Sequence, residues 1–279
     1  MSRKLLFVLV VSFSSFLLSC QKQNEDVPVY QSKGVGGNKK HAISVDAVSI
    51  TTENSLKQVS IDSNSLEFIV KAVLDSVYGR NKFDSSRGCW HHSFQTGGDS
   101  IEYCMIAAKP EAINADGGIM IYLQAYSDPQ AEIYSQVEPG LEGLFLIEVG
   151  AGKKWRVVAS NPAIDRGQAG DCGCLDSKLI EVGPSRYGWL STMGGVWQGI
   201  QATHYSLQVP IGSKIRDVSN IPRVRENSPG ESNTLEVERN GEVVAGMYPL
   251  KVTLSRGDSV LETRLVAYDE KQGFYPWKP

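Results

Sequence analysis

The sequence predicts a mainly β protein, an antiparallel sandwich or barrel-like domain with one N-terminal amphipathic helix. Three observations lead to this prediction. One stretch alone shows helical periodicity, the chain beyond it alternates between polar and apolar residues, and glycine-rich turn sequences separate its short apolar runs. Because helices do not alternate with the strands, an antiparallel arrangement is favoured over a parallel α/β sheet.

Composition excludes several classes of protein. The chain has 279 residues, of which 41% are hydrophobic and 21% charged, and this is typical of a globular protein rather than a disordered, collagen-like or multi-span membrane chain. Its formal net charge is -3 and it has no stripe of Lys and Arg, so it lacks the electrostatic footprint of a nucleic-acid-binding protein.

Residues 1–19 are predicted to form a signal peptide. Arg3 and Lys4 precede an apolar stretch that is the length of a secretory segment and too short for a stable membrane span. The stretch ends in Leu17-Leu18-Ser19-Cys20, which closely resembles the lipobox of bacterial lipoproteins. A plain secretory peptide with a chance cysteine is the alternative.

The lipobox resemblance implies that Cys20 receives a diacylglyceryl thioether, that the chain is cut before it and that the new amine is acylated. One acyl chain holds a protein only weakly, at ~0.8 kcal/mol per buried CH2, so stable anchoring needs two or more. By the same analogy, Gln21 after the cysteine favours the outer membrane. The run over residues 21–26 is similar to tracts that export some lipoproteins to the cell surface, and the membrane face stays undecided.

Residues 20–61 are predicted to be the lipidated N-terminus and a flexible tether. Their composition is polar and glycine-containing, and little in it could offset the entropy lost on ordering. Forty such residues have a reach of about 35 Å. Residues 62–279 are then expected to form one β-rich globular domain.

The predicted helix covers residues 64–78. Its apolar residues follow a helical spacing, Asn64 and Glu67 have the layout of a capping box, and Gly79 supplies a stop. One apolar stripe of this kind faces a core, and it consists of Leu66, Ile69, Val70, Val73, Leu74 and Val77.

The strands are predicted after the helix, where the periodicity changes to two. Residues 151–153 and 256–258 and the pair Asn240-Gly241 are expected to be turns, and residues 220–232 a polar loop. The predicted strands are 100–108, 118–127, 143–149, 155–160, 177–182, 187–192, 196–210, 213–218, 235–238, 250–254 and 259–268.

Four cysteines remain once Cys20 is assigned to lipid, and an even number in an exported domain points to disulfides. Cys172 and Cys174 together would close a very small ring. The options are cross-pairs between the two halves of the chain, or Cys89–Cys104 with a residual dithiol. We favour Cys89–Cys104, which joins the segment after the helix to the first clear strand.

Metal and cofactor binding are not predicted. Cys89, His91, His92 and Cys104 include suitable ligand types, but a structural zinc site needs two spaced pairs, and adjacent histidines on a strand point to opposite faces. Hydrogen-bonded or solvent-exposed histidines are the simpler interpretation.

One segment resembles an enzyme motif. Gly170-Asp171-Cys172-Gly173 is loosely similar to the nucleophile segment of papain-like cell-wall peptidases, which implies Cys172 as nucleophile and His204 as its base. Gly173 stands where the family has Ser, Cys174 could capture the thiol, and the segment that follows has a strand pattern instead of the helix that stabilises a thiolate.

Aromatic residues suggest a second candidate, a platform for sugar rings. Tyr187 and Trp189 are predicted to share one strand face, and Trp197 shares another with Tyr205, Leu207 and Val209. The competing interpretation is that these rings fill the core. The tail over residues 274–277 is expected to fold back over a sheet edge.

The sequence therefore favours a lipid-anchored binding or interaction module over an enzyme. The expected partners are the membrane, through the lipid, and an unknown protein or envelope polymer. The segments 138–145, 187–189 and 197–199 faintly resemble uncharacterised Gram-negative lipoproteins, and this resemblance implies no activity. A glycan-binding module and a Cys172/His204 peptidase are the alternatives.

Overall fold

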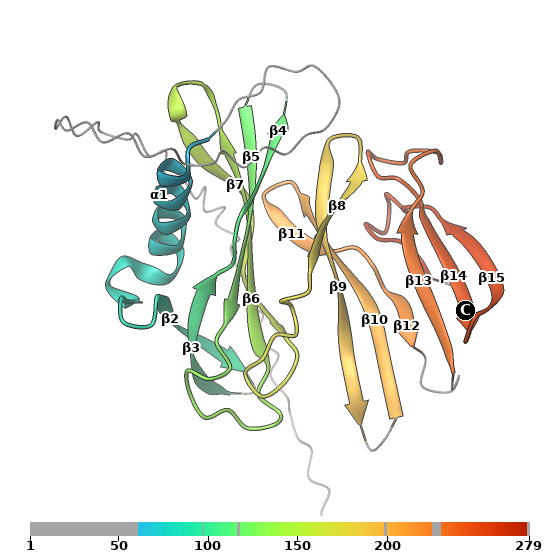
Figure 1. Ribbon diagram of the computed structural model, residues 1–279, viewed down its shortest axis with the longest axis horizontal. Helices are drawn as coiled ribbons and strands as arrows, with labels where there is room; N and C mark the ends of the chain where they lie inside the picture. Colours follow the sequence, from blue (N-terminus) through green and yellow to red (C-terminus); the bar gives the residue numbers. More distant parts are fainter. Residues whose placement is uncertain (1–60, 97, 116–117, 198–199, 225–229, 278–279) are drawn as a thin grey trace, which may run out of the picture.

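The computed structural model describes residues 61–96, 98–115, 118–197, 200–224 and 230–277. The predicted signal peptide, Cys20 and all of the predicted tether except its last residue lie outside this part. The described residues form two sheets and one helical segment longer than a single turn, which confirms the mainly β prediction (Figure 1).

The predicted helix is present and is followed by two further helical turns. Helix α1 covers Ser63–Leu74 and continues through a π-helical turn, η1 (Asp75–Gly79), and a 3-10 turn, η2 (Arg80–Lys82). The wider π turn rotates the apolar face, so Tyr78 is buried while Val77, expected on the apolar stripe, is 37% exposed. The buried stripe of α1 consists of Ile69, Val70, Val73 and Leu74.

Helix α1 begins one residue earlier than predicted, at Ser63. Asp62, not Asn64, is the N-cap, because its backbone is extended and its Oδ1 accepts a hydrogen bond from the Ser65 N–H at 2.8 Å. Gly79 has a φ of +101°, which favours glycine and ends the π turn as the sequence suggested.

The large sheet runs in the order β1-β2-β3-β5-β6-β7-β11-β10-β9-β8, with β4 beside β5 and β12 beside β10. Its pairs are antiparallel except β7 with β11, which meet in parallel at Ser160 and Lys214. Its strands are β1 (Phe83–Asp84), β2 (Cys89–Thr96), β3 (Asp99–Ala107), β4 (Glu111–Ala115), β5 (Gly118–Ser127), β6 (Gly140–Val149), β7 (Trp155–Arg166), β8 (Lys178–Gly183), β9 (Arg186–Trp197), β10 (Ile200–Ile211), β11 (Lys214–Asp217) and β12 (Ile221–Val224).

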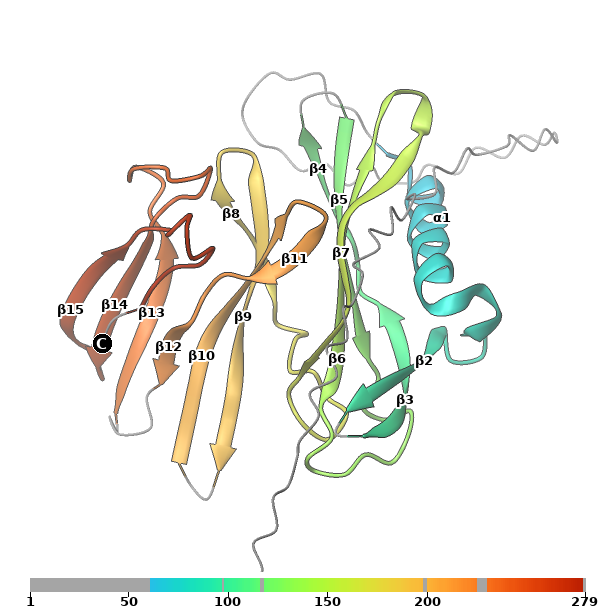
Figure 2. The ribbon, with the colours of Figure 1, turned by 180° about the vertical axis from the view of Figure 1, so that it is seen from behind.

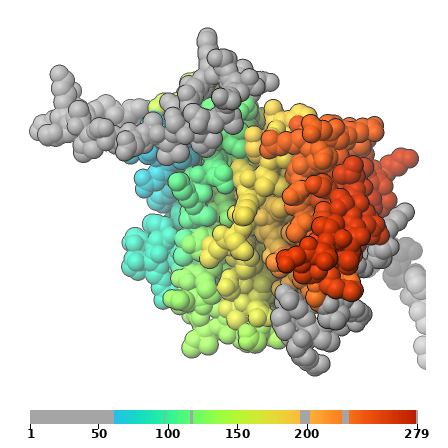
Figure 3. Space-filling view, turned by 45° about the vertical axis from the view of Figure 1, so that its right-hand side comes forward, coloured from blue at the N-terminus to red at the C-terminus, as the bar shows by residue number. Residues whose placement is uncertain are grey.

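The second sheet is an antiparallel meander of β13 (Glu231–Val237), β14 (Leu250–Arg256) and β15 (Ser259–Val266). Figures 1 and 2 show four layers in succession: α1, the β2–β7 part of the large sheet, its β8–β12 part, and the β13–β15 sheet. The space-filling view shows the same order across the surface, from blue to red (Figure 3).

Three apolar cores fill the spaces between the layers. The first lies between α1 and the β2–β7 region, the second between that region and β8–β11, and the third under β13–β15. Strand β5 shows how the middle layers are covered on both faces: Ile121 and Leu123 belong to the first core, and Tyr122 between them belongs to the second.

Several predicted strand limits are wrong. The predicted strand 196–210 is divided, because Trp197 at the end of β9 pairs antiparallel with Ile200 at the start of β10. The gap between the predicted strands 187–192 and 196–210 is also wrong, because β9 runs through it and contains Gly194, where a Cβ would come within 2.2 Å of the Ala202 carbonyl oxygen.

Other elements were missed. The predicted loop 220–232 contains β12, whose Ile221 pairs with Tyr205 and is buried, and β2 and β4 were not predicted as strands. The C-terminal tail does fold back, as expected. Its Tyr275 is buried in the third core and its N–H donates to the Val218 carbonyl at 2.8 Å.

Candidate functional site

The predicted aromatic platform begins with Tyr187 and Trp189, which share a face of β9. This face is directed into the second core, where the Trp189 ring meets Tyr122 edge-on with centroids 5.3 Å apart. Only 4% of Trp189 is exposed. A sugar ring needs an accessible aromatic face, so the Trp189 indole acts as core and not as a platform.

Tyr205 lies on the other face of the same sheet. It packs with Leu207 in the third core, and Leu207 pairs across the strands with Leu190, the neighbour of Trp189. Because successive side chains on a strand point to opposite faces, the structure does not bring Trp189 and Tyr205 together. The side chain of Trp197 lies outside the described residues.

The predicted peptidase pair has no free thiol. Cys172 is joined to Cys174 in a disulfide and is 2% exposed, so the residual dithiol expected beside a Cys89–Cys104 disulfide is wrong. A loop leads from it into β8 with no intervening helix, so no helix N-terminus stabilises a thiolate there. His204 lies in β10, and the Cys172 thiol that it was expected to activate is held in the disulfide.

The cysteine–histidine group near β2 is also accounted for by structural contacts. Cys89 and Cys104 form the favoured disulfide, with Cα atoms 5.4 Å apart. His91 lies beside Asp84, with Nε2 and Oδ2 3.7 Å apart, and the ring of His92 contacts Tyr78. Across the described part of the chain, no three His, Cys, Asp or Glu side chains gather as a metal site.

The candidate site that the structure favours instead is the end of the molecule where two long loops meet. The first loop, residues 128–139, joins β5 to β6, and the second loop, residues 167–177, joins β7 to β8. Both lie at the lower end of the β2–β7 region in Figure 1. We call them together the two-loop end. Loops of this length in a compact domain are often functional.

The Cys89–Cys104 disulfide supports the first loop. Ala131 packs against both cysteines, and its carbonyl accepts a hydrogen bond from Arg87 Nη1 at 3.1 Å. The N–H of Asp128 donates to the Cys104 carbonyl at 2.9 Å. The start of this loop is therefore tied to β2 and β3.

Two stacked tyrosines support the far side of the first loop. The rings of Tyr103 and Tyr134 lie 5.3 Å apart and nearly parallel, and the Tyr103 hydroxyl donates to the Pro139 carbonyl at 2.7 Å. Gly170 of the second loop lies directly against Tyr134, since a Cβ there would come within 2.1 Å of the ring. The two loops are in this way packed on each other.

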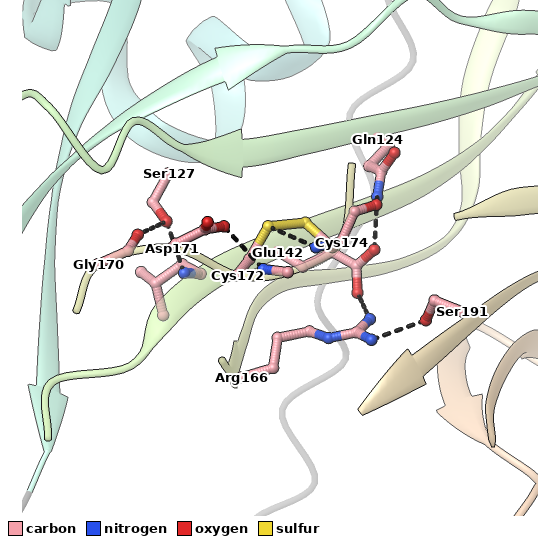
Figure 4. The surroundings of a disulfide bond; sticks show 11 residues. Gln124, Ser127, Glu142, Arg166, Gly170, Asp171, Cys172, Cys174 and Ser191 are labelled. Carbon is pink, nitrogen blue, oxygen red and sulfur yellow. Dashed lines mark hydrogen bonds and ion pairs between the residues drawn. A yellow bond between two sulfur atoms is a disulfide. The ribbon is translucent and has the colours of Figure 1, made fainter. Parts of the chain in front are cut away.

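The second loop is held by its own disulfide and by Ser127 (Figure 4). Ser127 Oγ donates to the Gly170 carbonyl at 2.7 Å and accepts from the Leu141 N–H at 2.8 Å. Asp171 Oδ1 accepts from the Gly173 N–H at 2.8 Å, inside the Cys172-Gly173-Cys174 ring. The two hydrogen bonds of Ser127 are buried, so they pair backbone groups of Gly170 and Leu141 that would otherwise lack a partner away from water.

A buried ion pair lies beneath the second loop. Glu142 and Arg166 are in direct contact and almost fully buried, and Arg166 Nη2 also donates to Ser191 Oγ at 2.7 Å (Figure 4). Gln124 Nε2 donates to both Glu142 Oε1 at 2.6 Å and the Cys174 carbonyl at 3.0 Å. Burial raises the pKa of Glu142, and the Arg166 guanidinium opposes this shift.

The tips of these fixed loops carry exposed apolar side chains. Ile133 is 101% exposed, Val137 78% and Leu175 63%. Neither loop contains Lys, Arg or His, whereas the two loops together contain five carboxylates. The loops are therefore more negative than the whole chain, whose formal net charge is -3. These acidic residues are Asp128, Glu132, Glu138, Asp171 and Asp176. The two-loop end therefore presents exposed apolar side chains among negative charges.

Sequence reasoning did not identify the two-loop end. It noted residues 138–145 and 170–173, which border the site, but for other reasons. Two signals were present: acidic residues in both loops with no basic residue inside either loop, and isolated Ile133, Val137 and Leu175 outside any periodic segment. Neither shows that the loops are adjacent in space, which depends on strand order.

Comparison of the chain with known protein families, with curated proteins and with solved structures finds no match. Its class is therefore given by its architecture, a four-layer, mainly β protein with one N-terminal helix. Among the described helices, none has the length and apolar character required to span a bilayer.

Proposed function

We propose that the protein is a lipid-anchored component of the bacterial envelope whose folded part is an interaction module. The anchor is supported by the lipobox-like Leu17-Leu18-Ser19-Cys20 sequence. The two disulfides support an exported location, because disulfides persist in oxidising compartments. The proposed contact surface is the two-loop end.

The observation that carries the interaction role is the exposure of Ile133, Val137 and Leu175 on loops that are otherwise tightly held. Exposed apolar side chains that gather at one end of a protein favour a binding surface, since no fold requirement places them in water. Loops already fixed by disulfides and buried hydrogen bonds lose little entropy when a partner binds.

The anchor is tested by the mass of the mature protein. We expect the purified chain to begin at Cys20 and to carry acyl mass, and a Cys20→Ser variant to lack that mass and to leave the membrane fraction. A mature chain free of acyl groups would refute the anchor.

The contact surface is tested by photocrosslinking in the native envelope. A photoreactive residue at Val137 is expected to give a crosslinked adduct. The same residue at Val260, another well exposed valine, on β15, is not expected to give one. Adducts at Val260 alone would move the surface away from the two-loop end.

A further inference from the structure

The exposed residues of the two-loop end also indicate the chemistry of what binds there. Ile133 is as exposed as it would be in an extended peptide, so it is a projecting knob and not the wall of a pocket. Small ligands bind in concave sites that surround them. A projecting apolar side chain instead fits a macromolecular partner that can enclose it.

The charge of the loops selects among macromolecular partners. Five carboxylates without a Lys, Arg or His on either loop repel phosphate, sulfate and anionic lipid headgroups. Arg87 flanks the first loop, but its Nη1 lies 3.9 Å from a Glu132 carboxylate oxygen and its hydrogen bond goes to Ala131. Lys178 is exposed directly after the second loop, and together with Arg87 it offsets only two of the five negative charges. The two-loop end as a whole therefore complements positive charge.

We infer that the two-loop end binds a basic, amphipathic segment of a partner protein. Apolar side chains of that segment pack on Ile133, Val137 and Leu175, and its Lys or Arg side chains face the surrounding carboxylates. This inference rests on the proposed interaction role and adds the chemistry of the partner. Charge complementarity of this kind mainly accelerates association and excludes partners of the wrong sign.

The test uses the full chain with Cys20→Ser, which keeps it free of lipid, and three synthetic peptides of equal length. One repeats Lys-Leu, the second replaces Lys by Glu, and the third replaces Leu by Ser. We expect the Lys-Leu peptide to bind, the Glu-Leu peptide not to bind, and the Lys-Ser peptide to bind at least tenfold more weakly.

Matched variants assign the binding to the loops. Ile133→Ser/Val137→Ser is expected to weaken Lys-Leu binding at least tenfold, whereas Val260→Ser/Leu261→Ser, which changes exposed apolar residues of β15, leaves it unchanged. Glu132→Gln/Asp176→Gln should weaken binding and reduce its salt dependence, and Asp258→Asn/Glu270→Gln, which are exposed elsewhere, should do neither.

Three results would overturn the inference: equal binding of the Lys-Leu and Glu-Leu peptides, equal binding of the Lys-Leu and Lys-Ser peptides, or equal effects of loop and control variants. Loop-dependent binding to phosphatidylglycerol vesicles would also overturn it, in favour of a membrane contact. Crosslinking at Val137 in the envelope stands apart from these results, so a wrong partner chemistry is distinguishable from a wrong interaction role.

Discussion

Glu142 and Arg166 are the most deeply buried charges described in the protein, and they lie at the base of the two-loop end. Burial of a charge is costly, and a buried pair is tolerated when its attraction and hydrogen bonds offset the loss of water. Gln124 and Ser191 supply those hydrogen bonds. The pair therefore links β6 and β7 to β9 in one defined arrangement.

Removing one charge should be far more damaging than removing both. Arg166→Met is expected to lower the free energy of unfolding by about 3–5 kcal/mol, because the Glu142 carboxylate stays buried alone. Glu142→Gln/Arg166→Met should lose less in urea denaturation. Lys251→Met, which breaks the exposed pair with Glu236, should change stability by about 1 kcal/mol or less, and a loss equal to that of Arg166→Met would contradict this account.

His92 gives the protein a pH-dependent stability. Burial lowers its pKa below the ordinary value, and the charge of Glu102 opposes the shift only partly. The folded state thus prefers the neutral imidazole, and this stability is fully present above about pH 6.5 and is lost as the pH falls through the lowered pKa.

The corresponding measurement is the free energy of unfolding at pH 7.5 and pH 5.5 for the wild type and for His92→Gln. The wild type is expected to lose more stability over this interval. Asp62 and Asp84 also have lowered pKa values, but as carboxyl groups they act at lower pH. Identical losses in both proteins would show that His92 does not titrate as inferred.

At the scale of elements, two glycines of the second loop allow the energetic effect of backbone conformation to be measured separately from the effect of packing between the loops. Gly170 and Gly173 both have positive φ, at 76° and 58°. A Cβ at Gly170 would collide with the Tyr134 ring, whereas at Gly173 it would meet open space. The two positions therefore form a matched pair.

Gly173→Ala should cost about 1 kcal/mol, the penalty for a left-handed alanine. Gly170→Ala should cost about 2–4 kcal/mol, because a steric clash is added to the same penalty. Chemical denaturation measures both losses, and limited proteolysis should show faster cleavage of the two loops in Gly170→Ala alone. Equal losses would mean that the two loops are not packed on each other.

The elements that sequence predicted best are those set by local periodicity. The apolar stripe of α1 and the alternation of β5 are visible in any short window, and the limits of β5 agree with the prediction. Strands β2 and β4 were missed because their residues are mixed in polarity and become strands by pairing with β3 and β5. The division between β9 and β10 was missed, and a gap was predicted between residues 192 and 196, where Gly194 in fact allows a close contact within β9.

At the scale of the whole molecule, the second core joins two halves that share little backbone pairing. Strands β7 and β11 pair at Ser160 and Lys214, and the halves also meet through the hydrogen bond from Arg166 to Ser191. The largest contact between them is formed by side chains around Trp189 and Tyr122. Cooperative unfolding of the two halves therefore depends on this core.

Trp189→Ala is expected to lower stability by about 3–5 kcal/mol and to separate unfolding into two transitions. Trp90→Ala, which removes an equally buried indole from the first core, should cost a similar amount within one transition. Circular dichroism and fluorescence recorded during urea denaturation distinguish the cases. One shared transition for Trp189→Ala would show that the halves are coupled by other contacts.

The sequence alone determined the class of the fold, the course of its helix and the expectation of a lipid-bearing Cys20, because each is written in adjacent residues. Strand order and the choice of which apolar residues stay exposed were decided only by tertiary structure. Tyr187 and Trp189 look like a platform in the sequence and are core, whereas Ile133 and Leu175 look incidental and form a surface. Packing of distant strands decides burial, and no local pattern encodes it.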